Sequence, residues 1–290
     1  LPAPDERANT NEEISENSGL GSSAAATVSG VSSAVAMADS DSAVAHTITY
    51  NDVSGTADTA TVTVAGLSGG AATDLTIAGV ETIALTASGT TNDFDLVATA
   101  AKTLTIAGTG EITLPNLDSA TTDSLTSIDA SSNSGAVTIT TGQQDTGSTT
   151  DLSVTGGSGN DTIDVSAHTN SDVSVDGGAG NDTITVALAS TDTIAGGDGT
   201  DTLSTSTVIT SGNVTGIEKL TITAGVTQDM DALSGNTITT VQMDNGATTA
   251  GVTDASSDVT TFITDNVAST TVSLARKTDT SSDSLSVTHR

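Results

Sequence analysis

The sequence is short of cysteine, aromatic residues and positive charge, and each shortage narrows the range of folds and partners. None of the 290 residues is cysteine, so neither a disulfide framework nor a thiolate metal site can form. Aromatic residues make up 1% of the chain, so a globular core built on large side chains is not expected. Lys and Arg total 6 against 36 Asp and Glu. The resulting net charge of −30 disfavours nucleic acid and anionic membranes as partners and favours divalent cations.

Long apolar runs are also missing. No stretch approaches the roughly twenty apolar residues that span a bilayer, so membrane insertion is not expected. The chain begins with Leu1 rather than methionine, and no charged-then-apolar signal segment follows. We therefore expect either a processed chain or a piece of a longer one, and we favour the second interpretation.

Short strands with period-two alternation of apolar and polar residues fill most of the chain. A phrase of alternating Thr and aliphatic residues closed by glycine recurs at residues 61–66, 75–79, 104–108 and 220–225. A second phrase, Gly-U-Glu-x-U-x-U-Thr-Ala with U an aliphatic residue, occurs at residues 79–87 and again at 216–224. The repeating unit is a short strand that ends in a turn, and no segment with the periodicity of a helix lies between the strands. This pattern predicts an all-β solenoid, namely a right-handed parallel β-helix.

The predicted solenoid covers residues 47–274. At about 20 residues per coil and about 4.8 Å between stacked strands, it would form roughly ten coils and a rod about 50 Å long. Residues 1–21 are predicted to form an extended acidic arm, and residues 22–46 to form lead-in strands or a cap. Residues 275–290 are predicted to form a tail.

Three glycine-rich nonapeptides in the middle of the chain carry the most specific signal. They occupy residues 156–164, 177–185 and 196–204, and all fit G-G-x-G-x-D-x-U-x. Successive copies start about 20 residues apart, close to the roughly 18 residues that two nonapeptides supply to one coil. Each copy should therefore begin a new coil and stack on the one before. The glycines would allow positive φ in a tight turn, which exposes backbone carbonyls.

These nonapeptides resemble the calcium-binding repeats of the RTX family, which form a β-roll. The resemblance implies that the Asp at position six and the turn carbonyls ligate calcium, here Asp161, Asp182 and Asp201. Calcium needs about six to eight oxygens, so two stacked turns are required for one ion, and three turns enclose two gaps. The alternative is a Gly/Asp-rich solenoid corner that binds no metal. The other predicted ligand residues lie in the same turns: Gly157, Gly159, Asn160, Gly178, Gly180, Asn181, Gly197, Asp198, Gly199 and Thr200.

A degenerate turn is expected on the opposite side of each coil. Asp151, Asp172 and Asp192 fall where that turn should lie and are secondary candidates for metal ligands. His168 lies between two glycine turns and could be a ligand, although an exposed position in a loop is favoured.

Catalytic constellations are not evident in the sequence. His46, His168 and His289 are isolated, and neither a metalloprotease motif nor a nucleophile elbow is present. The glycine turns contain no lysine and so do not form a phosphate-binding loop. We therefore expect a protein that is not an enzyme.

The Gly-U-Glu phrases and Thr-rich strands resemble the calcium-dependent surface-layer proteins of Gram-negative bacteria. This resemblance implies a secreted subunit, exported by a type I system, that assembles with copies of itself on the cell surface. Cell-surface polysaccharide is a second candidate partner. Two alternatives stay open: an adhesin, fibre or virion surface protein that binds a receptor or glycan, and the RTX segment of a secreted enzyme whose catalytic domain lies elsewhere.

Overall fold

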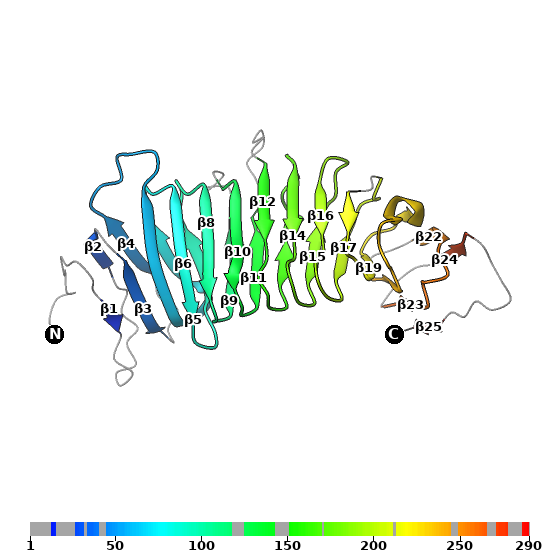
Figure 1. The fold of residues 1–290 in the computed structure, drawn as a ribbon, viewed down its shortest axis with the longest axis horizontal. Coiled ribbons are helices and arrows are strands. Elements are labelled where there is room, and N and C mark those ends of the chain that lie inside the picture. Colours follow the sequence, from blue (N-terminus) through cyan, green and yellow to red (C-terminus); the bar gives the residue numbers. More distant parts are fainter. Residues whose placement is uncertain are drawn as a thin grey trace.

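The structure, a computed structural model, is a stack of parallel strands. It describes residues 13–15, 27–31, 34–40, 45–117, 125–142, 151–169, 171–210, 213–244, 249–265, 271–277 and 286–289. Within these ranges every strand pairing is parallel, and each strand pairs with strands one coil earlier or later. The strands follow one another along the long axis of a rod, from β1 and β2 near one end to β24 near the other (Figure 1).

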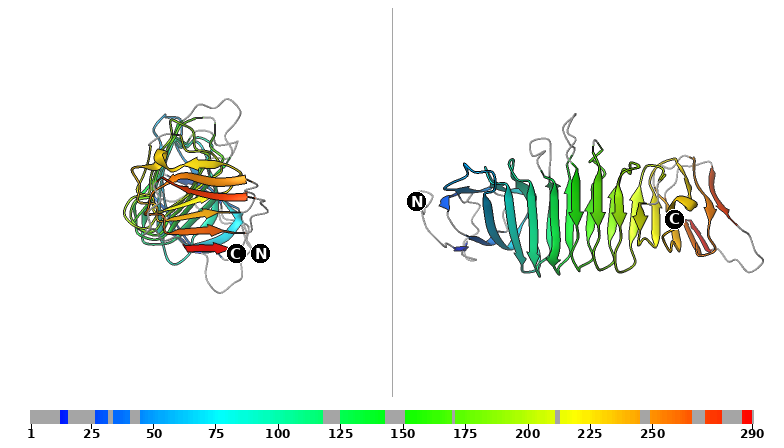
Figure 2. Two further views of the ribbon diagram at one scale, coloured as in Figure 1. Left: turned by 90° about the vertical axis from the view of Figure 1, so that its right-hand side faces the viewer. Right: turned by 45° about the horizontal axis from the view of Figure 1, so that its top comes forward.

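Each coil contributes one strand to each of two sheets, which the end-on view shows as the walls of one narrow solenoid (Figure 2). The strands of sheet A are β1 (Glu13–Ser15), β3 (Val35–Ser40), β6 (Thr82–Ser88), β8 (Thr103–Gly108), β10 (Ser127–Asn133), β12 (Leu152–Thr155), β14 (Val173–Asp176), β16 (Thr193–Ala195) and β18 (Val214–Thr215). The strands of sheet B are β2 (Thr27–Val31), β4 (His46–Tyr50), β7 (Asp93–Val97), β9 (Ile112–Leu117), β11 (Val137–Thr141), β13 (Thr162–Asp164), β15 (Thr183–Val186), β17 (Thr202–Thr205), β19 (Lys219–Ile222), β21 (Thr240–Met243), β23 (Thr261–Thr264) and β25 (Ser286–His289). The long strand β5 (Thr59–Ile77) belongs to both sheets, because its first part pairs with β6 and its last part with β4 and β7.

The core is a set of aliphatic columns that run along the rod. Inward and outward residues alternate in each strand, as the period-two pattern predicts, so the register stacks like side chains on one another. One buried column in sheet B consists of Leu114, Ile139, Ile163, Ile184, Leu203, Leu220, Val241 and Phe262. Small aliphatics suffice because each coil is covered by its two neighbours.

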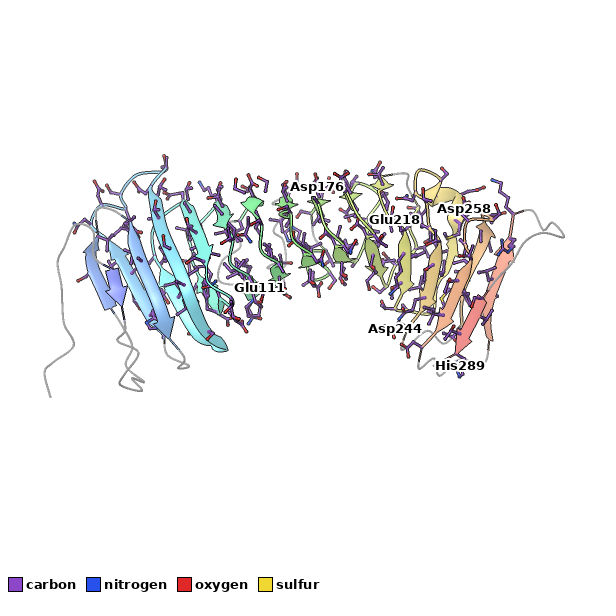
Figure 3. All side chains as sticks on the ribbon, turned by 60° about the horizontal axis from the view of Figure 1, so that its bottom comes forward. Glu111, Asp176, Glu218, Asp244, Asp258 and His289 are labelled. Atoms are coloured by element: carbon purple, nitrogen blue, oxygen red, sulfur yellow. The ribbon has the colours of Figure 1, made fainter. Side chains whose placement is uncertain are left out.

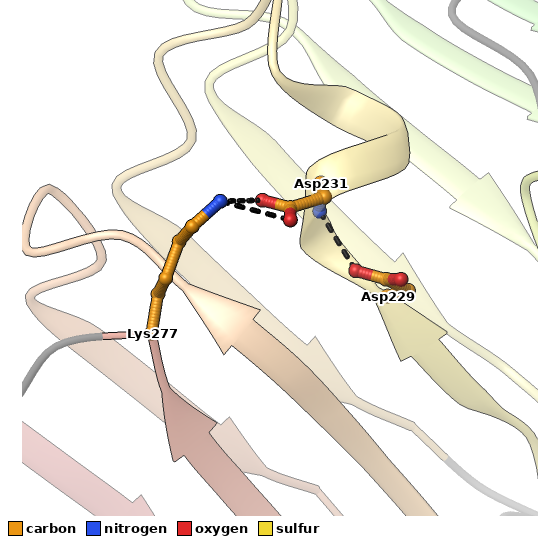
Figure 4. A network of polar contacts seen from close by, with 3 residues as sticks. All are labelled: Asp229, Asp231 and Lys277. Atoms are coloured by element: carbon orange, nitrogen blue, oxygen red, sulfur yellow. Dashed lines mark hydrogen bonds and ion pairs between the residues drawn. The ribbon is translucent and has the colours of Figure 1, made fainter.

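Beyond β18 a three-stranded sheet replaces sheet A. It contains β20 (Thr227–Asp229), β22 (Thr249–Ala255) and β24 (Thr271–Arg276), and the short 3-10 helix η1 (Met230–Leu233) follows β20. Lys277 Nζ lies 2.7 Å from Asp231 Oδ1, and this exposed pair ties the end of β24 to η1 (Figure 4). In the described part of the chain, no helix is long and apolar enough to cross a membrane.

The prediction of an all-β parallel solenoid of about ten turns is confirmed. The parallel stacking extends past the predicted limits at residues 47 and 274. It includes β1 in the predicted arm, β2 and β3 in the predicted lead-in, and β25 in the predicted tail. Residues 1–12 and 16–21 of the predicted arm, and residues 278–285 and 290 of the predicted tail, lie outside the described residues.

Candidate metal centre

The three glycine turns stack on one corner of the solenoid, which we call the glycine corner. This corner consists of the segments that join each sheet-A strand to the next sheet-B strand. Residues 156–161 join β12 to β13, residues 177–182 join β14 to β15, and residues 196–201 join β16 to β17. A parallel bridge between Ala179 and Asp198 links the second turn to the third. The stacking follows from the spacing of about 20 residues, because each turn falls at the same place in its coil.

The glycines permit close stacking of the three turns. Positive φ occurs only in the second and third turns. Gly178 and Gly197 adopt φ values of 98° and 105°. The glycines of the first turn do not have positive φ, so that expectation is wrong for the first turn. There a different constraint acts, because a methyl group on Gly157 would overlap the Asn133 carbonyl oxygen of the preceding coil. The residue types are thus explained by the backbone contact between coils as well as by turn conformation.

Four carboxylates form a row along the glycine corner, which we call the carboxylate row: Asp161, Asp182, Asp201 and Glu218. Each accepts a hydrogen bond from a backbone N–H of the preceding coil. Asp182 Oδ1 accepts from Asp161 N, and Asp201 Oδ1 accepts from Asp182 N, both at 2.8 Å. Asp161 Oδ1 and Glu218 Oε2 do the same for Val137 N and Asp201 N, also at 2.8 Å. One oxygen of each carboxylate is therefore committed to holding coils together.

The hydrogen bonding of the second carboxylate oxygen, Oδ2, differs between the first turn and the other two. Asp161 Oδ2 accepts a hydrogen bond from Gly157 N at 2.6 Å. Asp182 Oδ2 and Asp201 Oδ2 are buried and have no hydrogen-bond partner within the described ranges. Their residues are 1% and 0% exposed. A buried anionic oxygen without a partner is costly, so these two positions call for a proton or a cation.

The pKa values of the three aspartates are all raised, which also indicates that their ionised forms need a counterion. Burial raises the pKa of Asp182 to about 6, and the charges of Asp161, Asp201 and Asp176 add to the effect, while the hydrogen bond from Asp161 N opposes it. Burial also raises the pKa of Asp161, and it raises that of Asp201 with a contribution from the charge of Glu218. The fold therefore holds these carboxyl groups where ionisation without a counterion is unfavourable.

Backbone carbonyls converge on the same places. A methyl group on Gly177 would lie 2.6 Å from Asp182 Oδ2 and would overlap the Gly196 carbonyl oxygen of the next coil. Among the described residues, no cluster of three or more His, Cys, Asp or Glu side chains could hold a metal by itself. A bound ion would therefore need carbonyl ligands in addition to carboxylates. Mixed carboxylate and carbonyl oxygens are the ligand set of calcium, so the residues present fit that ion.

The remaining predicted residues of the glycine corner contribute mainly to stacking. Asn160 Oδ1 accepts from Asn181 N at 2.8 Å, and Asn181 Oδ1 accepts from Thr200 N at 2.9 Å. These side chains form an exposed ladder beside the carboxylate row. Asp198 is exposed, and its backbone bonds to Gly178 and Gly180 of the preceding turn. Gly159, Gly180 and Gly199 stack on one another, since a methyl group on either of the last two would overlap the carbonyl of the glycine one coil earlier.

The secondary candidates lie on the opposite corner, where sheet-B strands lead into sheet-A strands. Asp151 Oδ1 accepts from Asp172 N at 3.2 Å, and Asp172 Oδ1 accepts from Thr191 Oγ1. Asp192 is buried and uses both oxygens, accepting from Val173 N at 2.9 Å and from Ala189 N at 2.7 Å. These three carboxylates therefore serve as hydrogen-bond acceptors that order the corner.

His168 also lies at the opposite corner, away from the carboxylate row. Its side chain is 2% exposed, and Nε2 lies 2.9 Å from Ser171 Oγ. The favoured prediction of an exposed loop position is wrong. The polar residues near His168 suggested a loop, but the structure buries this residue.

Sequence reasoning missed the place of Glu218 in the carboxylate row. Its signal was the repeated Gly-U-Glu phrase, because Glu81 in the other copy accepts a hydrogen bond from Asp58 N at 3.0 Å in the same manner. Figure 3 shows Glu218 on the same edge of the solenoid as Asp176, which leads into the second glycine turn. The phrase therefore encodes a carboxylate that caps a backbone N–H one coil earlier.

Fold and corner together define a β-roll whose stacked glycine turns present buried carboxylates and carbonyls. Residues 153–168, 169–188 and 176–206 match the family model of the RTX calcium-binding nonapeptide repeat (4 copies). The middle of this solenoid is therefore a calcium-binding β-roll, a kind of structure typical of secreted proteins. No curated protein and no solved structure matches the chain significantly.

Proposed function

We propose that this protein is an extracellular structural subunit, without enzymatic activity, that assembles with copies of itself into a surface layer when calcium is present. Calcium binding to the glycine corner would make the middle of the rod rigid. The assembly itself would take place at the ends of the rod.

The observation that carries this proposal is an exposed apolar side chain on β25, the last strand that the structure describes. Val287 of β25 pairs in register with the buried Phe262 and so continues an aliphatic column of the core. Its side chain is nevertheless 64% exposed. An exposed apolar side chain in line with a core column favours contact with another surface, and we propose a second copy of this chain as that surface.

The edges of the end strands support the same contact. Among the described strands, β25 pairs only with β23, and β2 at the other end of sheet B pairs only with β4. Each strand thus presents backbone donors and acceptors on its outer side. Because all pairings are parallel, the edge at β25 of one copy can face the edge at β2 of the next in the direction used within the chain. Such a head-to-tail contact generates rows of subunits when the rotation between copies does not close a ring.

The absence of enzymatic activity is proposed from the placement of the histidines. His46 lies in β4, His168 at the opposite corner and His289 in β25, so they belong to distant coils. The extracellular location is proposed from the RTX repeats, the lack of cysteine and the net charge of −30, which suits a calcium-rich medium.

Electron microscopy of the purified chain with calcium or with chelator tests the proposal. Wild-type protein should form ordered sheets or filaments only with calcium. Val287→Asp should abolish them, because it places a charge in the proposed contact. Val208→Asp is the matched control, since Val208 is a valine 41% exposed on the side of the rod, and this variant should assemble normally.

Two results would contradict the proposal. Discrete particles of wild-type protein with calcium would reject the layer and favour a receptor- or glycan-binding role. Equal assembly with and without calcium would reject the role of the ion.

A further inference from the structure

The carboxylate row continues past the last nonapeptide without a break. The hydrogen bond that joins Asp182 to Asp161 spans 21 residues, and the one that joins Asp201 to Asp182 spans 19. Glu218 then bonds to Asp201 N across 17 residues, with the same 2.8 Å distance. Glu218 therefore takes the place in the next coil that an aspartate takes in the nonapeptides.

The turn that contains Glu218 also repeats the carbonyl contact of the glycine turns. A methyl group on Gly196 would lie 2.7 Å from Asp201 Oδ2 and would overlap the carbonyl oxygen of Gly216. This is the arrangement found one coil earlier, where Gly177 faces Asp182 Oδ2 and the Gly196 carbonyl. Gly216 itself adopts a φ of 65°, as a glycine can without strain.

Asp201 Oδ2 supplies an independent indication of a ligand. It is fully buried and has no hydrogen-bond partner in the described part of the chain, although Oδ1 of the same side chain is bonded. The oxygen is directed to the space that the Gly216 carbonyl also approaches. Two oxygens that converge without a donor between them are stabilised by a cation.

The first glycine turn differs in this respect. There the Gly157 N–H donates to Asp161 Oδ2 at 2.6 Å, so that oxygen already has a partner. In the second turn, positive φ at Gly178 accompanies a different bond, because its N–H donates to Asp176 Oδ1 at 3.1 Å. The unpartnered oxygens therefore belong to Asp182 and Asp201, which lie one and two coils further along the chain than Asp161.

We propose that a calcium ion binds between the Asp201 turn and the Gly216–Glu218 turn, held by Asp201, the Gly216 carbonyl and the carboxylate of Glu218. Gly216 and Glu218 lie outside the residues that match the nonapeptide model, which end at 206. A second ion belongs to the gap between Asp182 and the Gly196 carbonyl. This inference rests on the calcium binding described above and assigns it to particular residues.

The choice of calcium follows from the ligands. Carboxylate and peptide oxygens are hard ligands, and the site contains neither sulfur nor imidazole. Calcium tolerates irregular coordination and takes carbonyl ligands readily, whereas magnesium demands a regular octahedron and keeps several waters. Glu218 is only half-buried, which leaves access for the ion.

Calcium titration by calorimetry on the chelator-stripped chain tests the assignment. Glu218→Gln keeps an oxygen that can accept from Asp201 N but removes the charge. This variant should bind one ion fewer than wild type, or bind one ion about 10- to 100-fold more weakly. Glu81→Gln is the matched control, because Glu81 occupies the same phrase and caps Asp58 N but follows no nonapeptide. It should bind calcium as wild type does.

Circular dichroism without calcium shows whether Glu218→Gln is folded like wild type. If it is not, Asp201→Asn replaces it, and that variant should also lose one ion. Unchanged stoichiometry and affinity in the variant used would overturn the inference, as would an equal loss in Glu81→Gln. Failure of the surface-layer proposal is separate, since it would appear as missing assembly by a chain that binds its full complement of calcium.

Discussion

The raised pKa of Asp182 predicts that acid stabilises the calcium-free protein and destabilises the calcium-bound one. Burial raises this pKa from 3.8 to about 6, and the charges of Asp161, Asp201 and Asp176 add to the effect. A difference of one pKa unit between the folded and unfolded states corresponds to roughly 1.4 kcal/mol. The difference at Asp182 therefore lowers the free energy of unfolding by about 3 kcal/mol when the side chain is ionised. Well below pH 3.8 the carboxyl group is protonated in both the folded and the unfolded state, so this cost is absent. It grows between about pH 4 and pH 6 and is complete above that range.

The unfolding free energy of the stripped protein should therefore rise by up to about 3 kcal/mol from this group as the pH falls from 7.5 to about 4. Asp161 and Asp201 act in the same direction, because burial raises their pKa values too. With saturating calcium the slope should reverse, since protons then compete with the ion for the same oxygens. Urea unfolding followed by circular dichroism, at a series of pH values with and without calcium, measures both slopes.

Asp182→Asn separates this effect from the general repulsion of a chain with net charge −30. The variant should lose most of the pH dependence of the stripped protein. Asp258→Asn changes the same charge at an exposed position and should retain it. The reasoning fails if the stripped wild-type protein becomes less stable on acidification, or if both variants show the wild-type slope.

Two further predictions concern the glycine corner. Removal of calcium at low ionic strength should leave residues 151–204 partly unfolded, because unneutralised carboxylates repel one another there. Hydrogen exchange should then show lost protection in that region and retained protection in β6 and β8, and uniform protection would contradict this. Gly178→Ala should destabilise the protein by about 1–3 kcal/mol, because its methyl group would overlap the Gly157 carbonyl. Gly235→Ala, whose methyl group meets nothing within 4 Å, should stay within about 0.5 kcal/mol of wild type in the same thermal melts.

The sequence predicted the solenoid and the stacking of the turns because both depend on local patterns. Alternation in strands such as β6 and the regular return of glycine-rich turns determine which residues face inward and how far apart the coils start. The carboxylate row depends instead on which oxygen of a side chain meets which coil. Nothing in the spacing of the first nonapeptide indicates that Asp161 Oδ2 would find the Gly157 N–H while the later aspartates find no donor.

The other misplaced residues have the same origin. His168 is surrounded by polar residues in the chain, and only the folding of the corner against neighbouring coils buries it. The three-stranded sheet of β20, β22 and β24 could not be anticipated either, because its strands carry no glycine-closed phrase. In both cases the outcome is decided by packing between coils rather than by a repeat within one.

Other coils of the glycine corner contain side-chain amides that donate to backbone carbonyls, which the carboxylates of Asp182 and Asp201 cannot do. Asn92 is buried there, and its Nδ2 donates to the carbonyls of Ser88 and Glu111 at 3.0 Å and 2.9 Å. Asn236 likewise donates to the carbonyls of Val214 and Leu233, at 2.8 Å and 3.2 Å. In these coils an amide provides the donors that converging backbone carbonyls require, so no ion is needed.

Aspartate at the same corner provides only acceptors and no donor. Asp182 and Asp201 accept a backbone N–H as the asparagines do, but they have no donor to offer the carbonyls of Gly196 and Gly216. Only carboxylate and carbonyl oxygens then remain in the buried space. We expect a cation to bind these oxygens in place of the amide N–H groups. A difference of one side-chain atom, oxygen in place of nitrogen, thus divides coils in which an amide donates to the backbone carbonyls from coils in which we expect calcium to bind them. Under the proposed function, the placement of these coils in the middle of the rod would let calcium control the rigidity of that section.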